Sequence, residues 1–395
     1  MAAGRSAETH VRRPLEEELT DHTRSGRPHM TAPATDRPRL AWLTAETPDR
    51  HGSGGQRRQY HQIRALVHAD IDVRVAALAG PQDDTSVREL AHVQRFGSLR
   101  LRGLLVDPGL DRFVADGRFD SAVVAHLESV AHVRLVLARR RVPWLLDLHN
   151  VNSRWHAARG DARAAAVWRR RERAALRGAK MGTVCSREEL SALLNAGPRA
   201  RAEVAAHGVH SAEWPQEALA RERGQSLAFF GAWSHGPNAE GAEWLAERVW
   251  PRIREAVPAA RLLLAGPGQP PPSILSQPGV EHVGRVKDLA RFLGGARIAV
   301  VPILNGIGAR MKFVEALASG AAVVSTATGA EGFEADGAFA LADDADDFAR
   351  ACCELLGDAR RAAALGRAGR ALAFDRYDWL ASSEPIVRFA RSFGR

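Results

Sequence analysis

Cysteine, lysine and long apolar runs are all scarce in this sequence of 395 residues. No apolar run approaches the ~18 residues that a membrane-spanning helix needs, so we expect no transmembrane segment. The three cysteines, Cys185 and the adjacent Cys352 and Cys353, make neither a disulfide framework nor a zinc-binding spacing. The spacing of the 15 histidines does not indicate a metal site either. These absences predict a protein of the reducing cytoplasm that needs no metal or other cofactor.

Aromatic residues are also few, at 6% of the chain, and they are not interleaved with the basic runs. A net charge of +9 suggests a nucleic acid or an anionic membrane as a partner. We do not expect nucleic-acid binding, because no RNA-binding or DNA-binding motif accompanies the charge. The basic segments Arg139–Arg141 and Trp168–Arg177 leave weak contact with an anionic membrane open. The predicted location is cytoplasmic, with peripheral contact at the inner membrane face as an option.

The chain is too long for a usual single domain, and its 45% hydrophobic content is enough for two cores. Residues 1–37 are polar and lack an apolar stretch, which predicts a disordered tail without a signal peptide. Strand and helix patterns alternate over 38–207 and again over 226–376, which predicts two α/β domains. The polar segment 208–225 is the expected linker, and 377–395 is predicted to hold a final helix.

The most informative stretch runs from Pro302 to Phe333. An apolar strand is followed by a loop with Gly306 and Gly308, and then by a helix that we expect to begin near Arg310. A glycine loop at a helix start forms an anion site, because unpaired backbone N–H groups and the positive helix end point at the same space.

Two cations, Arg310 and Lys312, lie in the first turn of this predicted helix. Cations act against the helix dipole there, so their placement suggests a role other than helix stability. The sequence holds 55 lysines and arginines together, but its only lysines are Lys180, Lys287 and Lys312. Lysine offers a compact charge for a phosphate oxygen. The turn therefore predicts a diphosphate site; the alternative is a solvated helix start with two incidental cations.

The run G-x-G-x-R-x-K-x-x-E-A-x-x-x-G, which starts at Gly306, resembles the donor-site signature of family 4 glycosyltransferases. Phe229–Leu245 and Arg261–Gly268 resemble two further strand-and-loop segments of that family. The resemblance covers about residues 38–390 and implies the GT-B fold, in which two doubly wound Rossmann-like α/β domains face each other across a cleft. It also implies transfer of a sugar from a nucleoside-diphosphate-sugar donor to an acceptor hydroxyl, with the anomeric configuration retained.

The resemblance assigns donor binding to the second domain. Glu315 matches the second glutamate of the family's E-x7-E motif, which holds the nucleotide ribose, whereas Ile307 stands where the first glutamate is expected. The loop Gly231–Asn238 lacks the arginine and lysine that many relatives place at the diphosphate, so Arg310 and Lys312 are expected to supply that charge. The other expected donor-binding residues of this domain are three glycines and an amide: Gly231, Asn238, Gly266 and Gly308.

The first domain is expected to supply the opposite wall. The loop SGGQRRQ, with Gly54 and Gly55, resembles the family's glycine loop near the donor phosphate and the acceptor, although glycine loops also arise for steric reasons alone. His126 follows a predicted strand and is either a polar residue that ends the strand or, as in relatives that often carry a histidine there, a residue that approaches the transferred sugar. His149 and Asn150 follow another strand and are either cleft residues or part of a turn that caps the next helix.

The sequence thus predicts a glycosyltransferase in which Arg310 and Lys312 neutralise the leaving diphosphate and His126 acts beside the sugar. A sugar-nucleotide epimerase can share this architecture, and the missing glutamate at Ile307 leaves a non-catalytic, nucleotide-sensing protein open. The nucleobase and sugar of the donor stay open. So does the acceptor, which is a glycan, a lipid-linked intermediate or a small metabolite.

Overall fold

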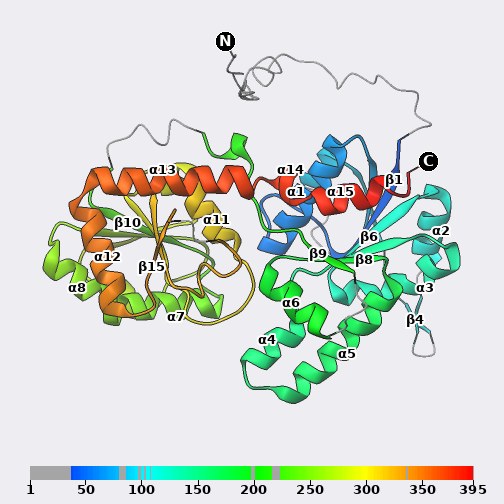
Figure 1. The fold of residues 1–395 in the computed structure, drawn as a ribbon, viewed down its shortest axis with the longest axis horizontal. Coiled ribbons are helices and arrows are strands. Elements are labelled where there is room, and N and C mark those ends of the chain that lie inside the picture. Colours follow the sequence, from blue (N-terminus) through cyan, green and yellow to red (C-terminus); the bar gives the residue numbers. More distant parts are fainter. Residues whose placement is uncertain are drawn as a thin grey trace, which may run out of the picture. The chain divides into compact units, whose positions relative to one another are not determined.

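Two parallel β-sheets, one in each half of the chain, organise the protein (Figure 1). The structure is a computed structural model that describes residues 37–79, 86–96, 99–101, 104–106, 108–196, 201–215, 223–334 and 337–394. All of these residues belong to one compact unit. The tail predicted over 1–37 lies outside the described residues except for Arg37, and so does the middle of the predicted linker.

The N-terminal sheet has seven parallel strands in the order β3-β2-β1-β6-β7-β8-β9. Its central strands are apolar runs that are buried along their length, as expected where helices cover both faces of a parallel sheet. The strands are β1 (Arg39–Glu46), β2 (Asp72–Ala79), β3 (His92–Arg95), β6 (Ser121–Ala125), β7 (Trp144–Asp147), β8 (Met181–Val184) and β9 (Ala202–Val204). A separate antiparallel pair consists of β4 (Leu99–Leu101) and β5 (Leu104–Val106).

The C-terminal sheet has six parallel strands in the order β12-β11-β10-β13-β14-β15. Apolar clusters pack on both of its faces. The strands are β10 (Ser226–Phe230), β11 (Arg261–Ala265), β12 (Val280–Gly284), β13 (Ile298–Val301), β14 (Ala322–Ser325) and β15 (Ala340–Leu341).

Helices connect the strands of both sheets, as right-handed βαβ units require. The helices of the N-terminal half are α1 (Gly54–His68), α2 (Pro108–Gly117), α3 (Val130–Arg140), α4 (Asn152–Ala158), α5 (Ala162–Gly178) and α6 (Arg187–Ala196). Those that follow are α7 (Gly236–Trp244), α8 (Trp250–Ala256), α9 (Pro272–Leu275), α10 (Leu289–Gly294), α11 (Met311–Ala318), α12 (Ala345–Gly357), α13 (Ala359–Arg376), α14 (Trp379–Ser382) and α15 (Glu384–Arg391).

In each sheet, the chain adds strands first to one side of the starting strand and then to the other. The candidate site lies at the point where this direction changes. In the first sheet the change lies between β1 and β6, whose carboxyl ends meet where Thr44 is in register with Ala125. In the second sheet it lies between β10 and β13. The loops after two adjacent strands diverge at such a point, and open α/β sheets bind ligands in the crevice that results.

The end of the chain differs from the single helix predicted over 377–393. It forms two helices, α14 and α15, which are separated at Ser383. Pro385 lies in the first turn of α15 and has no N–H to continue the hydrogen bonds of α14, so the one-helix prediction was wrong. Apolar residues of α15, including Ile386 and Phe389, belong to the core cluster around β1 and α1, so the chain end packs on the N-terminal half.

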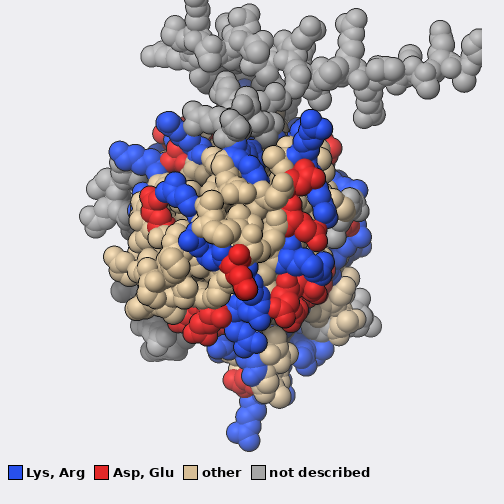
Figure 2. Space-filling model, turned by 90° about the vertical axis from the view of Figure 1, so that its left-hand side faces the viewer, with Lys and Arg blue, Asp and Glu red and all other residues tan. Residues whose placement is uncertain are grey.

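The charged surface mixes both signs on the face drawn in Figure 2. In the basic segment at the end of α3, Arg139 and Arg140 both pair with Asp111, at 2.5 Å and 2.7 Å. Those two side chains are therefore partly neutralised by the protein itself. No helix within the described part of the chain combines the length and the apolar character that crossing a membrane requires.

Candidate active site

A cavity of about 450 Å³ is lined by residues from both halves of the chain. It lies at the loops that follow the central strands of the two sheets. Eight residues singled out in the sequence line it: Gly54, Gly55, His126, His149, Asn150, Asn238, Arg310 and Lys312. Four others lie outside its lining: Gly231, Gly266, Gly308 and Glu315.

The start of α11 forms the cationic wall of this cavity. Arg310 is the N-cap residue of α11, and its backbone is extended; no side chain caps the helix. Its guanidinium donates to the carbonyl oxygens of Gly308, at 3.1 Å, and Thr328. The ammonium group of Lys312 donates to the carbonyl oxygen of Phe230, at 3.0 Å, and to Oδ1 of Asn238. Neutral oxygens therefore hold both side chains at the cavity.

Burial shifts the titration of Lys312. Its ammonium group is desolvated and lies near Arg310, and together these effects lower the pKa of Lys312 to about 7, although Glu315 acts in the opposite direction. An anion in the cavity would favour the charged form of the lysine and raise this pKa.

Glu315 lies behind this wall and is only 2% exposed. Its carboxylate pairs with the guanidinium of Arg57, which belongs to α1 in the other half of the chain. The ribose-binding role of Glu315 therefore stays a prediction, and a ligand ribose would share the carboxylate with Arg57. Sequence reasoning missed Arg57, although it comes directly after the Gly54–Gly55 loop.

His126 and Glu46 form the most polar part of the opposite wall. His126 adopts a φ of 66°, which is uncommon for a residue with a side chain and often marks a functional site. Its Nε2 lies 3.2 Å from Oε1 of Glu46 and 3.1 Å from the side-chain nitrogen of Gln59. Sequence reasoning missed Glu46, and the signal was available, because this acidic residue ends the first buried strand.

A buried ion pair supports this wall from behind. Arg58 donates to both carboxylate oxygens of Asp147, at 2.8 Å and 3.1 Å, and neither side chain is exposed. Thr183 donates to the same carboxylate at 2.7 Å, and Nε2 of His149 lies 3.1 Å from it. Burial alone would raise the pKa of Asp147, but Arg58 and His149 hold it well below its usual range. The network fixes His149, whose own pKa is lowered to about 4, mainly by burial.

Two of the predicted glycines have a structural reason to be glycine. A Cβ at Gly266 would lie 1.8 Å from the carbonyl oxygen of Gly231, so the turns after β10 and β11 touch there. A Cβ at Gly55 would lie 3.1 Å from both Oε1 of Glu46 and Nδ1 of His149. A side chain at Gly55, in the first turn of α1, would therefore crowd the polar side chains that line the cavity.

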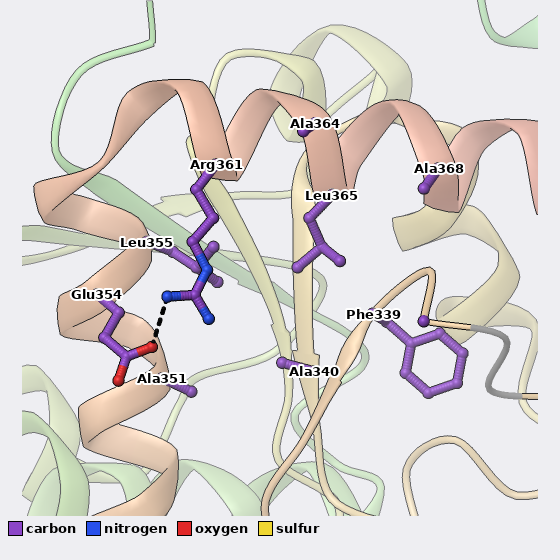
Figure 3. Close-up of a pocket in the computed structure, with 10 residues that line it drawn as sticks. Phe339, Ala340, Ala351, Glu354, Leu355, Arg361, Ala364, Leu365 and Ala368 are labelled. Carbon is purple, nitrogen blue, oxygen red and sulfur yellow. Dashed lines mark ion pairs between the residues drawn. The ribbon is translucent and has the colours of Figure 1, made fainter.

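A second cavity of about 440 Å³ lies in the C-terminal half, away from the predicted site residues (Figure 3). Its lining from α12, α13 and the strand β15 is mostly apolar, and Arg361 pairs with Glu354 at its edge, at 2.9 Å. Among the residues that the structure describes, no cluster of three His, Cys, Asp or Glu side chains has the arrangement of a metal site.

Two family models match the two halves of the chain. Residues 53–208 match the glycosyl transferase 4-like domain, and residues 224–358 match the glycosyl transferases group 1 domain. The chain belongs to the glycosyltransferases with the GT-B fold, of the family 4-like type. The predicted fold and family resemblance are confirmed.

Solved structures of similar fold extend over nearly the whole chain. The sucrose-phosphate synthase of Thermosynechococcus elongatus has 17% identity and a TM-score of 0.68, and the match covers 90% of this chain and 99% of that one. HepE of Anabaena, in complex with UDP and glucose, has 15% identity and a TM-score of 0.68, with 90% and 100% covered. WaaG, a glycosyltransferase involved in lipopolysaccharide biosynthesis, has 13% identity and a TM-score of 0.62, with 89% and 99% covered. No curated protein sequence matches the chain.

Proposed function

We propose that this glycosyltransferase moves a sugar from a nucleoside-diphosphate-sugar donor to an acceptor hydroxyl, with retention of the anomeric configuration. The observation that carries the proposal is the composition of the cavity. Arg310, Lys312 and the uncapped start of α11 lie on one wall, and His126 and the first turn of α1, with Gly54 and Gly55, lie on the other. Similar folds in complex with UDP or UDP-glucose support a nucleotide-sugar donor.

The cationic wall suits a diphosphate leaving group. When the bond to the sugar breaks, negative charge accumulates on the diphosphate, and prearranged cations and N–H groups stabilise that charge in the transition state. Lys312 and Arg310 are held in place by carbonyl and amide oxygens before the ligand arrives, so little reorganisation is needed. The two cations therefore act as electrostatic stabilisers of the leaving group.

Helix α5 exposes six arginines, which suit contact with an anionic surface if the acceptor is lipid-linked: Arg163, Arg169, Arg170, Arg171, Arg173 and Arg177. Flotation with anionic vesicles at low and high salt tests this contact. Binding that is lost at high salt supports a lipid-linked acceptor, and a wholly unbound protein at low salt favours a water-soluble one.

The experiment that tests the function starts with the nucleotide. Thermal shifts with UDP, GDP, ADP and TDP identify the base, because a ligand at 100 times its Kd stabilises a protein by about 2.7 kcal/mol. The matching nucleotide-sugars are then incubated with sugar acceptors, and NMR of the product reports its anomeric configuration. Release of an epimerised nucleotide-sugar instead of a glycoside would show an epimerase. Binding without turnover of any donor would support a nucleotide sensor.

A further inference from the structure

The side chain of Glu46 has an unusual position in the cavity. It is the one carboxylate among the described residues of the lining, which also contains the cations Arg310 and Lys312. Its side chain is 38% exposed, and hydrogen bonding to His126 keeps the pKa of this carboxyl below its ordinary value. A carboxylate repels a diphosphate, so the diphosphate belongs at the cationic wall and Glu46 faces a different part of the ligand.

The orientation of the Gln59 amide limits what His126 can offer Glu46. The indole N–H of Trp42 donates to Oε1 of Gln59 at 3.0 Å, and an indole nitrogen can only donate. The amide NH₂ of Gln59 therefore points at Nε2 of His126, 3.1 Å away. Because that amide nitrogen is a donor, its preferred partner is an Nε2 that carries no hydrogen.

Nε2 of His126 thus has two incompatible partners. Without a hydrogen it accepts from Gln59 and cannot donate to the Glu46 oxygen 3.2 Å away. With a hydrogen it donates to Glu46, and the NH₂ group of Gln59 then loses its acceptor. Nε2 of His126 cannot serve both neighbours in a single protonation state. A hydroxyl group of a ligand removes the conflict, because it donates to Glu46 while His126 accepts from Gln59.

Gly55, in the first turn of α1, packs closely against the same polar side chains. A Cβ at Gly55 would approach Oε1 of Glu46 and Nδ1 of His149 to 3.1 Å, and Cε1 of His126 to 3.4 Å. Glu46, His126 and His149 all line the cavity of about 450 Å³. We propose that Glu46 binds a hydroxyl group of a neutral sugar there and thereby selects neutral sugars against uronic acids, whose carboxylate it would repel.

This inference rests on the proposed function and deepens it by naming a sugar class and a specificity residue. The hydroxyl belongs either to the transferred sugar or to the acceptor, and the chemistry is the same in both cases. Calorimetry with UDP, UDP-glucose and UDP-glucuronic acid measures the donor side for the wild type, Glu46→Ala and Glu46→Gln. Steady-state kinetics with a hydroxylated acceptor measure the other side. Glu128→Gln is the matched control, since Glu128 is exposed and lies two residues from His126.

We expect all three proteins to bind UDP equally. The wild type binds UDP-glucose more tightly than UDP-glucuronic acid, and Glu46→Ala weakens UDP-glucose binding by about tenfold to a hundredfold, which corresponds to a hydrogen bond to a charged group. Glu46→Gln keeps part of the hydroxyl bond but loses the rejection of the uronic acid. If the hydroxyl belongs to the acceptor, donor binding stays constant and the acceptor KM rises by a similar factor.

Equal UDP-glucose affinity, equal uronic-acid discrimination and equal acceptor KM in Glu46→Ala and Glu128→Gln would overturn the inference while leaving the proposed function intact. A wild-type protein that binds neither UDP nor a UDP-sugar and transfers no sugar would instead overturn the proposed function, and this inference with it.

Discussion

Helices α1 and α11 both begin at the cavity, but their first turns differ. In α1, Ser53 and Gln56 form a capping box, so side chains already accept from two backbone N–H groups at the helix start, those of Ser53 and Gln56. In α11, Arg310 holds the N-cap position without a capping hydrogen bond from its side chain. Of two helix starts that face the same space, the uncapped one beside two cations is suited to receive an anion.

The supports behind the two walls differ as well. The N-terminal half buries a charged network around Arg58 and Asp147, whereas Lys312 in the C-terminal half is held by Phe230 and Asn238 through neutral oxygens. The first arrangement fixes side chains by mutual charge compensation. The second places a basic side chain next to the cavity with no carboxylate among its described hydrogen-bond partners, although Glu315 lies near enough to act on its charge. The difference predicts that substitutions in the network behind the N-terminal wall act mainly on stability and those of the cations in the C-terminal wall mainly on catalysis.

The largest expected effect comes from breaking the buried pair. Arg58→Met leaves Asp147 as an uncompensated charge with no exposed surface, which should lower the free energy of unfolding by about 3–5 kcal/mol. Urea denaturation measures the loss. The double variant Arg58→Met/Asp147→Leu removes both charges and should recover part of the stability. A loss for Arg58→Met below about 1 kcal/mol would contradict the role of the network as the support of this wall.

For Lys312→Met we expect a loss of activity with little change in stability. Loss of a hydrogen-bonded charge on the diphosphate, at about 1.5–3 kcal/mol, should lower kcat/KM by roughly ten to two hundred fold. The free energy of unfolding should fall little or even rise at pH 6, because the buried lysine, whose pKa is lowered to about 7, is charged there at a cost to the folded state. Steady-state kinetics and urea denaturation on the same samples separate the two effects. Transfer at the parental rate would contradict the diphosphate assignment.

A smaller and more selective effect is expected for Glu315→Gln. If the carboxylate holds the ribose, nucleotide affinity should fall about tenfold while the affinity for inorganic pyrophosphate is largely kept. Arg57→Met is the control, because Arg57 is the described ion-pair partner of Glu315. Calorimetry that shows the same loss for nucleotide and pyrophosphate would make Glu315 a structural partner of Arg57 and not a ribose ligand.

The same comparison explains what the sequence could predict. The cationic wall is one continuous stretch, so local patterns placed β13, the glycine loop and α11 almost at their observed bounds. The polar wall joins Glu46, Gln59, His126 and His149 from separate elements, and they meet only because β1, β6 and β7 are adjacent in the sheet. Spacing along the chain does not contain that strand order. The separation between α14 and α15 could have been predicted, because Pro385 is a local signal that a helix cannot continue through that position.

The last prediction concerns pH and follows from the buried lysine. The pKa of Lys312 is about 7 in the empty protein, below its ordinary value of 10.5, because burial disfavours the charged form. A bound diphosphate favours that form, so binding above pH 7 must take up a proton. Nucleotide affinity should therefore change little through this group below pH 7 and fall above it, by up to tenfold per pH unit.

Between about pH 7.5 and 9 the terminal phosphate of UDP is already ionised, which leaves Lys312 as the expected source of the slope. Calorimetry in buffers with different ionisation enthalpies counts the protons taken up, and the count should approach one per UDP at pH 8.5. In Lys312→Met, both the slope and the proton uptake should disappear, while weak binding through Arg310 and the start of α11 remains. An identical proton uptake in the two proteins would mean that the titrating group lies elsewhere and that the C-terminal wall carries its full charge before the nucleotide binds.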